Sequence, residues 1–148
     1  MKTKFRKVRV ILALFAVFAT FLLLSANLSV AADCNGEPCT IECRGPDTCR
    51  GTDGNDVICA DSDGQTIYAQ DGDDVVCAGG GDDLVYGGKG DDDIAGQGGD
   101  DTIRGQGGND CISGGPGDDN LQGNTGYDVV LGQRGEDRCD SEVAFQCE

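Results

Sequence analysis

The stretch Gly105-Gln-Gly-Gly-Asn-Asp-Cys-Ile-Ser113 decides the fold, because its pattern recurs every nine residues from Gly51 to Asp140. Ten units follow one another without an insertion or a deletion. Gly stands at the first and fourth positions of the unit, Asp at the sixth and an aliphatic residue at the eighth. The eighth position reads Ile58, Ile67, Val76, Val85, Ile94, Ile103, Ile112, Leu121, Val130 and Cys139. A strict nine-residue period is typical of architectures in which consecutive units stack on one another.

Each unit predicts a turn followed by a short strand. Positions seven to nine form a three-residue strand, in which the middle side chain faces the core and its neighbours face outward. Positions one to six are rich in Gly, which adopts turn conformations that other residues resist. Two units then make one coil of eighteen residues. The period therefore predicts an all-β fold, a right-handed parallel β-roll (a β-helix solenoid), with a small disulfide-rich N-terminal cap.

The sixth position carries the candidate metal ligands. Residues eighteen apart lie on the same side of such a roll, about 4.8 Å from each other, so the sixth position forms one column of carboxylates on each side. A hard cation bound by two stacked carboxylates and by turn carbonyls would remove their repulsion. Calcium suits such turns better than magnesium, because it accepts six to eight oxygen ligands in flexible geometry. The expected ligands are Asp56, Asp74, Asp83, Asp92, Asp101, Asp110, Asp119, Asp128 and Asp137.

The second unit departs from the pattern. Asp63 replaces Gly at its fourth position and Gln65 replaces Asp at its sixth, although Ile67 keeps the aliphatic column in register. We therefore expect a strand with a poor calcium loop at this place. A disordered acidic tract is the alternative for the whole repeat region, but disorder does not require a co-registered aliphatic column.

Residues 51–140 resemble the repeats-in-toxin, or haemolysin-type, calcium-binding repeats. The segments Gly87-Gly-Lys-Gly-Asp-Asp-Asp-Ile-Ala95 and Gly114-Gly-Pro-Gly-Asp-Asp-Asn-Leu-Gln122 carry this resemblance. It implies a parallel β-roll that holds several Ca²⁺ ions between consecutive turns on each side. Many family members attach the roll to a lipase, protease or toxin. Nothing of that size precedes the repeats here, so no such activity is carried over.

The N-terminus has the composition of a secretory signal peptide, which we assign to residues 1–32. A basic segment precedes the uncharged stretch Val10–Leu24, and small residues follow it. The uncharged stretch is shorter than the ~20 residues that a membrane-spanning helix needs, so we expect cleavage, an extracellular location and no membrane span afterwards. Five of the 11 basic residues and none of the 27 acidic residues lie in this segment, which leaves residues 33–148 with a net charge of −21. Such a charge repels nucleic acid and anionic membranes and favours cations as partners.

Nine cysteines in a secreted chain predict disulfides, and the odd number leaves at least one free thiol or a bridge to another chain. Cys34, Cys39, Cys43 and Cys49 predict a two-disulfide cap over residues 33–50, and any of three pairings satisfies this prediction. Cys59 and Cys77 both occupy position nine, eighteen residues apart, and we expect them to be bridged.

The C-terminal cysteines complete the predicted disulfide pattern. A Cys139–Cys147 bridge would fold residues 141–148 across the open end of the roll as a C-terminal cap. Cys111 is then the expected unpaired cysteine.

The leading hypothesis from the sequence is a secreted calcium-binding repeat protein with a structural or adhesive role and no catalysis of its own. The chain lacks His, which excludes a catalytic triad that contains one. The alternative is a disulfide-rich interaction or inhibitor module displayed on a calcium-stabilised roll. The protein or surface that the molecule binds is not indicated by the sequence.

Overall fold

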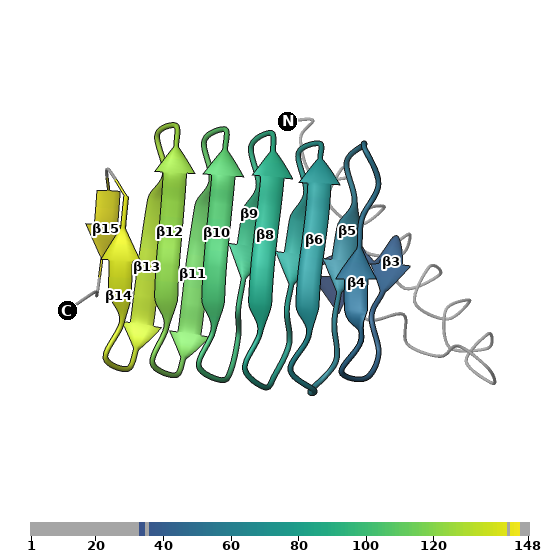
Figure 1. The fold of residues 1–148 in the computed structure, drawn as a ribbon, viewed down its shortest axis with the longest axis horizontal. Coiled ribbons are helices and arrows are strands. Elements are labelled where there is room, and N and C mark those ends of the chain that lie inside the picture. Colours follow the sequence, from purple (N-terminus) through teal and green to yellow (C-terminus); the bar gives the residue numbers. More distant parts are fainter. Residues whose placement is uncertain (1–32, 35, 142, 146–148) are drawn as a thin grey trace, which may run out of the picture. The chain divides into compact units, whose positions relative to one another are not determined.

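The computed structural model describes residues 33, 34, 36–141 and 143–145, so the predicted signal peptide lies outside the described residues. The regular secondary structure in this part of the chain consists of β-strands alone, and these strands form a parallel β-solenoid (Figure 1). No helix that could cross a membrane occurs within these ranges.

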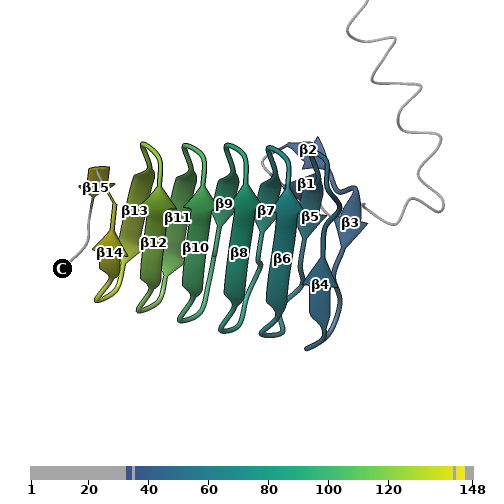
Figure 2. The ribbon, with the colours of Figure 1, turned by 45° about the horizontal axis from the view of Figure 1, so that its top comes forward.

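Two sheets make up the wall of the roll (Figure 2). The even sheet contains, in spatial order, β14 (Arg138–Asp140), β12 (Asn120–Thr125), β10 (Thr102–Gly107), β8 (Leu84–Lys89), β6 (Thr66–Asp71) and β4 (Thr48–Arg50). The odd sheet contains β15 (Val143–Phe145), β13 (Val129–Arg134), β11 (Cys111–Pro116), β9 (Asp93–Ala95), β7 (Val75–Cys77), β5 (Val57–Cys59) and β3 (Ile41–Glu42). Within the repeats the register is eighteen residues, as in the pairs Ile58↔Val76 and Ile103↔Leu121. This confirms the predicted coil of two units.

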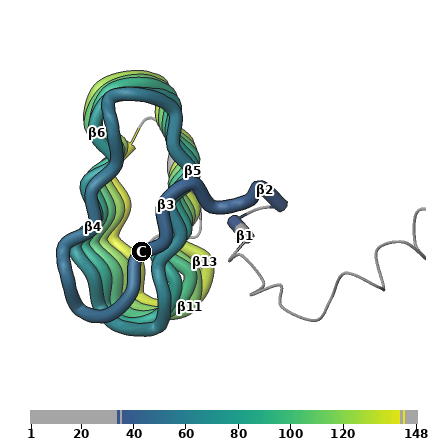
Figure 3. The backbone as a smooth tube through the Cα atoms, turned by 90° about the vertical axis from the view of Figure 1, so that its right-hand side faces the viewer, coloured from purple at the N-terminus to yellow at the C-terminus, as the bar shows by residue number. Residues whose placement is uncertain are grey.

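The core lies between the two sheets. All nine aliphatic side chains at position eight have 0% exposure, and Cys139 packs against the same cluster. The view along the roll shows the two sheets as the long sides of a closed loop, with the turns at its ends (Figure 3). Position one also faces inward, since Ala69 and Ala78 are fully buried. The inward alternation thus continues one residue further than the sequence predicts.

Several strands are longer than the predicted three residues. β10 runs through positions seven to nine of one unit and one to three of the next, and its pairing with β12 omits only Gly105. The coils have equal length, so turn residues also find backbone partners on the next coil, as in the bond that the Gly90 N–H donates to the Gly107 carbonyl. The ladder therefore extends into the turns.

The roll begins before the first nonapeptide. β3 pairs in parallel with β5, and β4 pairs in parallel with β6, so residues 41–50 continue both sheets. β1 (Asp33–Cys34) and β2 (Glu37–Pro38) form a separate antiparallel pair, and β1 contacts β5 and β7 of the odd sheet.

The predicted Cys59–Cys77 disulfide is wrong. Cys34 bridges Cys77 and Cys39 bridges Cys59, with Cα separations of 5.7 and 5.8 Å. Cys59 and Cys77 are register partners on β5 and β7, as predicted. Side chains stacked in this way point in the same direction, which keeps their Cβ atoms near the strand spacing of about 4.8 Å, beyond the usual 3.5–4.5 Å of a disulfide. The N-terminal segment approaches from outside and supplies better placed partners.

The self-contained two-disulfide cap is also wrong. Of the four N-terminal cysteines only Cys43 and Cys49 pair with each other. The other two bind the N-terminal segment to the roll.

At the C-terminal end β15 pairs in parallel with β13 and continues the odd sheet, where the sequence predicts a tail across the open end. Cys139 is disulfide-bonded, and its predicted partner Cys147 lies outside the described residues. Cys111 is exposed and is the free cysteine of the described chain, as predicted.

The outer faces of the two sheets differ. On the even sheet the rings of Tyr68 and Tyr86 are stacked with centroids 5.0 Å apart, and Arg50 and Arg104 lie over their outer faces. On the odd sheet several outward positions carry apolar residues, among them Val129 and Val143, which are 38% and 42% exposed.

Candidate metal sites

The sixth-position acids form two buried columns, one on each side of the roll. The nine predicted ligands are all at most 8% exposed. In each column the Oδ1 atom of one acid accepts a hydrogen bond from the backbone N–H of the residue eighteen positions earlier. Examples are the Asp74 N–H to Asp92 bond of 2.9 Å and the Asp101 N–H to Asp119 bond of 2.9 Å. The structure therefore brings together the residues that the sequence selected.

In most of these acids the other carboxylate oxygen, Oδ2, accepts no hydrogen bond from the described residues. The Oδ2 atoms of eight acids are buried without a hydrogen bond in the described part of the chain. They belong to Asp74, Asp83, Asp92, Asp101, Asp110, Asp119, Asp128 and Asp137. A buried polar atom without a partner is costly, and a buried charge even more so. These atoms are suited to a bound cation.

Position one makes room for these oxygen atoms. A Cβ at Gly105 would lie 2.1 Å from Asp110 Oδ2, and one at Gly96 would lie 2.3 Å from Asp101 Oδ2. Sequence reasoning explained these glycines by backbone freedom alone and did not connect them with the acid five residues later. The change from Ala at position one in the second to fourth units to Gly from Gly87 onward was the available signal.

Burial disfavours the ionised form of several sixth-position carboxylates. It raises the pKa of Asp92 and Asp101 to about 7, and neighbouring carboxylates add to the effect against the opposing backbone hydrogen bonds. It also raises the pKa of Asp83 and Asp110 to about 6. A cation beside them would favour the ionised form.

Backbone oxygens must complete any coordination. Within the described ranges no three Cys, Asp or Glu side chains converge on one point. Two stacked carboxylates then supply only part of a shell of six to eight oxygens. Turn carbonyls are the remaining candidates, as the sequence predicts.

The turns are held by a second set of side chains at position five. Asp73 accepts a bond from the Asp91 N–H at 3.0 Å, and Asp91 accepts one from the Asn109 N–H at 2.7 Å. These bonds run to the following coil, whereas those of the sixth position run to the preceding one. Successive turns are therefore fixed in both directions. The sequence analysis did not identify this role.

Comparison with known families gives one match. The model of the RTX calcium-binding nonapeptide repeat, which spans four copies, matches residues 44–62, 50–85, 60–94, 86–121 and 113–142. No curated protein and no solved structure gives a significant match. RTX nonapeptide repeats bind several Ca²⁺ ions.

Proposed function

Since the chain belongs to the RTX calcium-binding nonapeptide repeat family, we propose that it is a secreted protein whose roll holds Ca²⁺ ions between stacked turns and acts as a structural or adhesive module. The unpartnered Oδ2 atom repeated in eight acids is the observation that carries this proposal. The proposed ligands are the nine sixth-position aspartates. Asp56 differs from the interior ones, because its Oδ2 already accepts hydrogen bonds from Thr52. The disulfides support an oxidising, extracellular location.

The ions would act mainly on stability. Each ion would join two coils, since the carboxylates that it binds come from consecutive turns on one side. A ligand that binds only the folded state stabilises that state by mass action. We therefore propose that the repeats fold as calcium binds, and we propose no catalytic role.

The alternative of a separate disulfide-rich interaction module has less support. Cys34 and Cys39 are bridged to Cys77 and Cys59 of the roll, so residues 33–50 are not a self-contained unit. Residues 41–50 also contribute strands to both sheets.

A calcium titration of oxidised protein lacking residues 1–32, followed by far-UV circular dichroism, tests the proposal. We expect β structure to increase with calcium and to be lost again on chelation. Magnesium at the same concentration is the control, because it demands a tighter octahedron and keeps its water. A chelated sample with a full β spectrum and a cooperative melt would contradict the proposal.

A further inference from the structure

The two acid columns end differently at the N-terminal edge of the roll. Asp56 differs from the interior acids, because within the described residues its Oδ2 accepts bonds from the Thr52 N–H at 2.7 Å and the Thr52 hydroxyl at 2.9 Å. Its Oδ1 accepts a bond from the Thr40 hydroxyl at 3.4 Å. Donors of the chain therefore satisfy this carboxylate.

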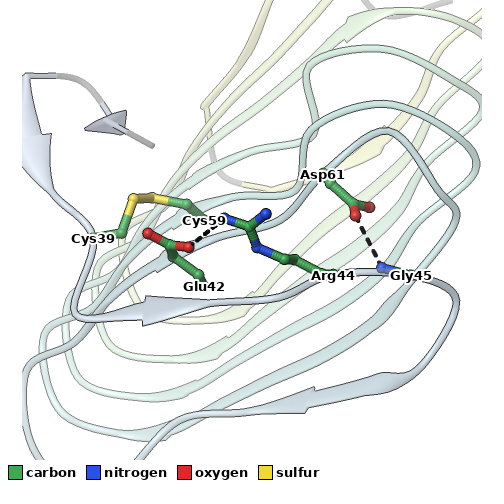
Figure 4. A network of polar contacts seen from close by, with 6 residues as sticks. All are labelled: Cys39, Glu42, Arg44, Gly45, Cys59 and Asp61. Atoms are coloured by element: carbon green, nitrogen blue, oxygen red, sulfur yellow. Dashed lines mark hydrogen bonds and ion pairs between the residues drawn. A yellow bond between two sulfur atoms is a disulfide. The ribbon is translucent and has the colours of Figure 1, made fainter. Parts of the chain in front are cut away.

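The other column ends at Gln65, and its amide nitrogen has both of its donors used. Gln65 Nε2 donates to the Gly45 carbonyl at 3.1 Å and to Asp61 Oδ1. The Gly45 N–H in turn donates to Asp61 Oδ2 at 2.9 Å (Figure 4). The bonds from the Gly45 and Asp63 backbone N–H groups lower the pKa of Asp61, so its carboxylate is ionised at neutral pH.

The partners of this amide nitrogen are the kinds of oxygen that a calcium ion binds. One is a turn carbonyl and the other is a carboxylate. Gln65 Oε1, by contrast, is buried without a partner, like the Oδ2 atoms of the following repeats. The Gln65 side chain thus places its Nε2 donor between two oxygens that would otherwise call for a cation. Its Oε1 remains an unpartnered acceptor, as the Oδ2 atoms do in the following repeats.

Three disulfides lie close to Gln65 in the sequence. The bridges Cys34–Cys77, Cys39–Cys59 and Cys43–Cys49 all lie within residues 33–77. Disulfides stabilise mainly by restricting the unfolded chain. This segment therefore has sources of stability that do not depend on an ion.

We infer that residues 33–77 form a template that folds without calcium, in which the Gln65 amide nitrogen takes the place of a cation, and on which the calcium-dependent repeats assemble. The inference rests on the proposed function, because residues 33–77 differ from the later repeats in this way only if those repeats require calcium to fold. It assigns Gln65 a positioning role at the point where the sequence shows only a defective repeat.

Hydrogen exchange of the oxidised protein lacking residues 1–32, measured by mass spectrometry with chelator and with calcium, tests the template. With chelator we expect protection in β5 and β6 and fast exchange in β10 and β12. With calcium all four strands are expected to be protected.

Two variants test the role of Gln65. Q65D removes both amide donors and adds a charge beside Asp61, so protection of β5 and β6 with chelator should fall by at least about 10-fold, because hydrogen bonds to a charged group are lost. Calcium should restore the protection, which shows that the variant folds. Q106D is the matched control, since Gln106 is an exposed glutamine in the middle of the roll, and it should leave the exchange of β5 and β6 unchanged.

The outcomes separate the two proposals. Fast exchange of β5 and β6 with chelator in the unmodified sequence would overturn the template, while a response of β10 and β12 to calcium would still support the proposed function. Protection of all four strands with chelator would contradict both. An unchanged Q65D would overturn the role of its amide nitrogen.

Discussion

Substitution of Asp92 by Asn and by Ala separates the two functions of a sixth-position acid. Asp92 Oδ1 accepts the buried Asp74 N–H at 2.9 Å, and Oδ2 has no partner. Asn retains an oxygen that can accept the N–H bond but lacks the charge. Ala removes both, and the unsatisfied N–H should cost about 1–3 kcal/mol in free energy of unfolding relative to Asn.

The same pair of substitutions at Asp137 serves as the edge comparison. Asp137 Oδ1 also accepts a backbone bond, from the Asp119 N–H at 3.0 Å, so the Asn-to-Ala difference should be similar there. The column ends at Asp137, whereas Asp92 has Asp74 and Asp110 on its two sides. D92N therefore removes a charged ligand from two candidate calcium sites, one on each side of its turn. D137N removes a charged ligand from only one such site. Loss of an outer-shell partner alone costs about 10–100-fold in metal affinity, so we expect at least that loss for D92N and a smaller one for D137N.

Urea denaturation at saturating calcium measures the Asn-to-Ala difference, and calorimetric calcium titration measures the affinity. Equal affinity losses for D92N and D137N would refute the stacked-turn arrangement of the sites. Equal stability of D92N and D92A would show that the Oδ1 bond to the backbone contributes nothing.

Three further predictions concern the turns, the core and pH. A Cβ at Gly108, where φ is +135°, would lie 2.0 Å from the Gly90 carbonyl oxygen, so G108A should lower the free energy of unfolding by about 3 kcal/mol or more in urea denaturation. G98A is the control, because Gly98 has open space around it, and it should change this free energy by less than about 0.5 kcal/mol. Ile103→Ala should lose about 2–5 kcal/mol and Ile103→Val about 0.5–1.5 kcal/mol in the same assay, and equal losses would contradict a packed core. The pKa values of Asp92 and Asp101 are raised from 3.8 to about 7, so between these values the folded state binds more protons than the unfolded state, and the calcium-free roll should gain stability as pH falls from 7 toward 4. Circular dichroism of dialysed, calcium-free protein measures this effect, and the absence of any gain in β structure on acidification to pH about 5 would contradict it.

The strict period explains why much of the fold could be predicted. Position eight identifies the core, and the sum of two units gives the register that pairs Ile103 with Leu121. The buried ladder of sixth-position acids follows from the same register. Each of these features depends only on which residues are stacked.

Features that interrupt the period could not be predicted in the same way. The sequence shows that Cys59 and Cys77 are stacked, but it does not show where the aperiodic segment 33–50 lies, and that segment supplies their partners. The state of Asp56 also depends on local donors at the edge, Thr52 and Thr40, which the repeat pattern does not contain.

Because the outer faces of the two sheets differ, odd-numbered and even-numbered nonapeptide units are not interchangeable. Removal of residues 87–95 would preserve the nonapeptide pattern but move every later strand to the opposite sheet, so Arg104 would be stacked on Cys77 and lose its contact with Tyr86. Removal of residues 87–104 would shorten the roll by one coil and place Gln122 over Tyr86, with each outward column intact. The sequence repeats every nine residues, but the smallest segment that can be added or removed without mixing the two faces has eighteen.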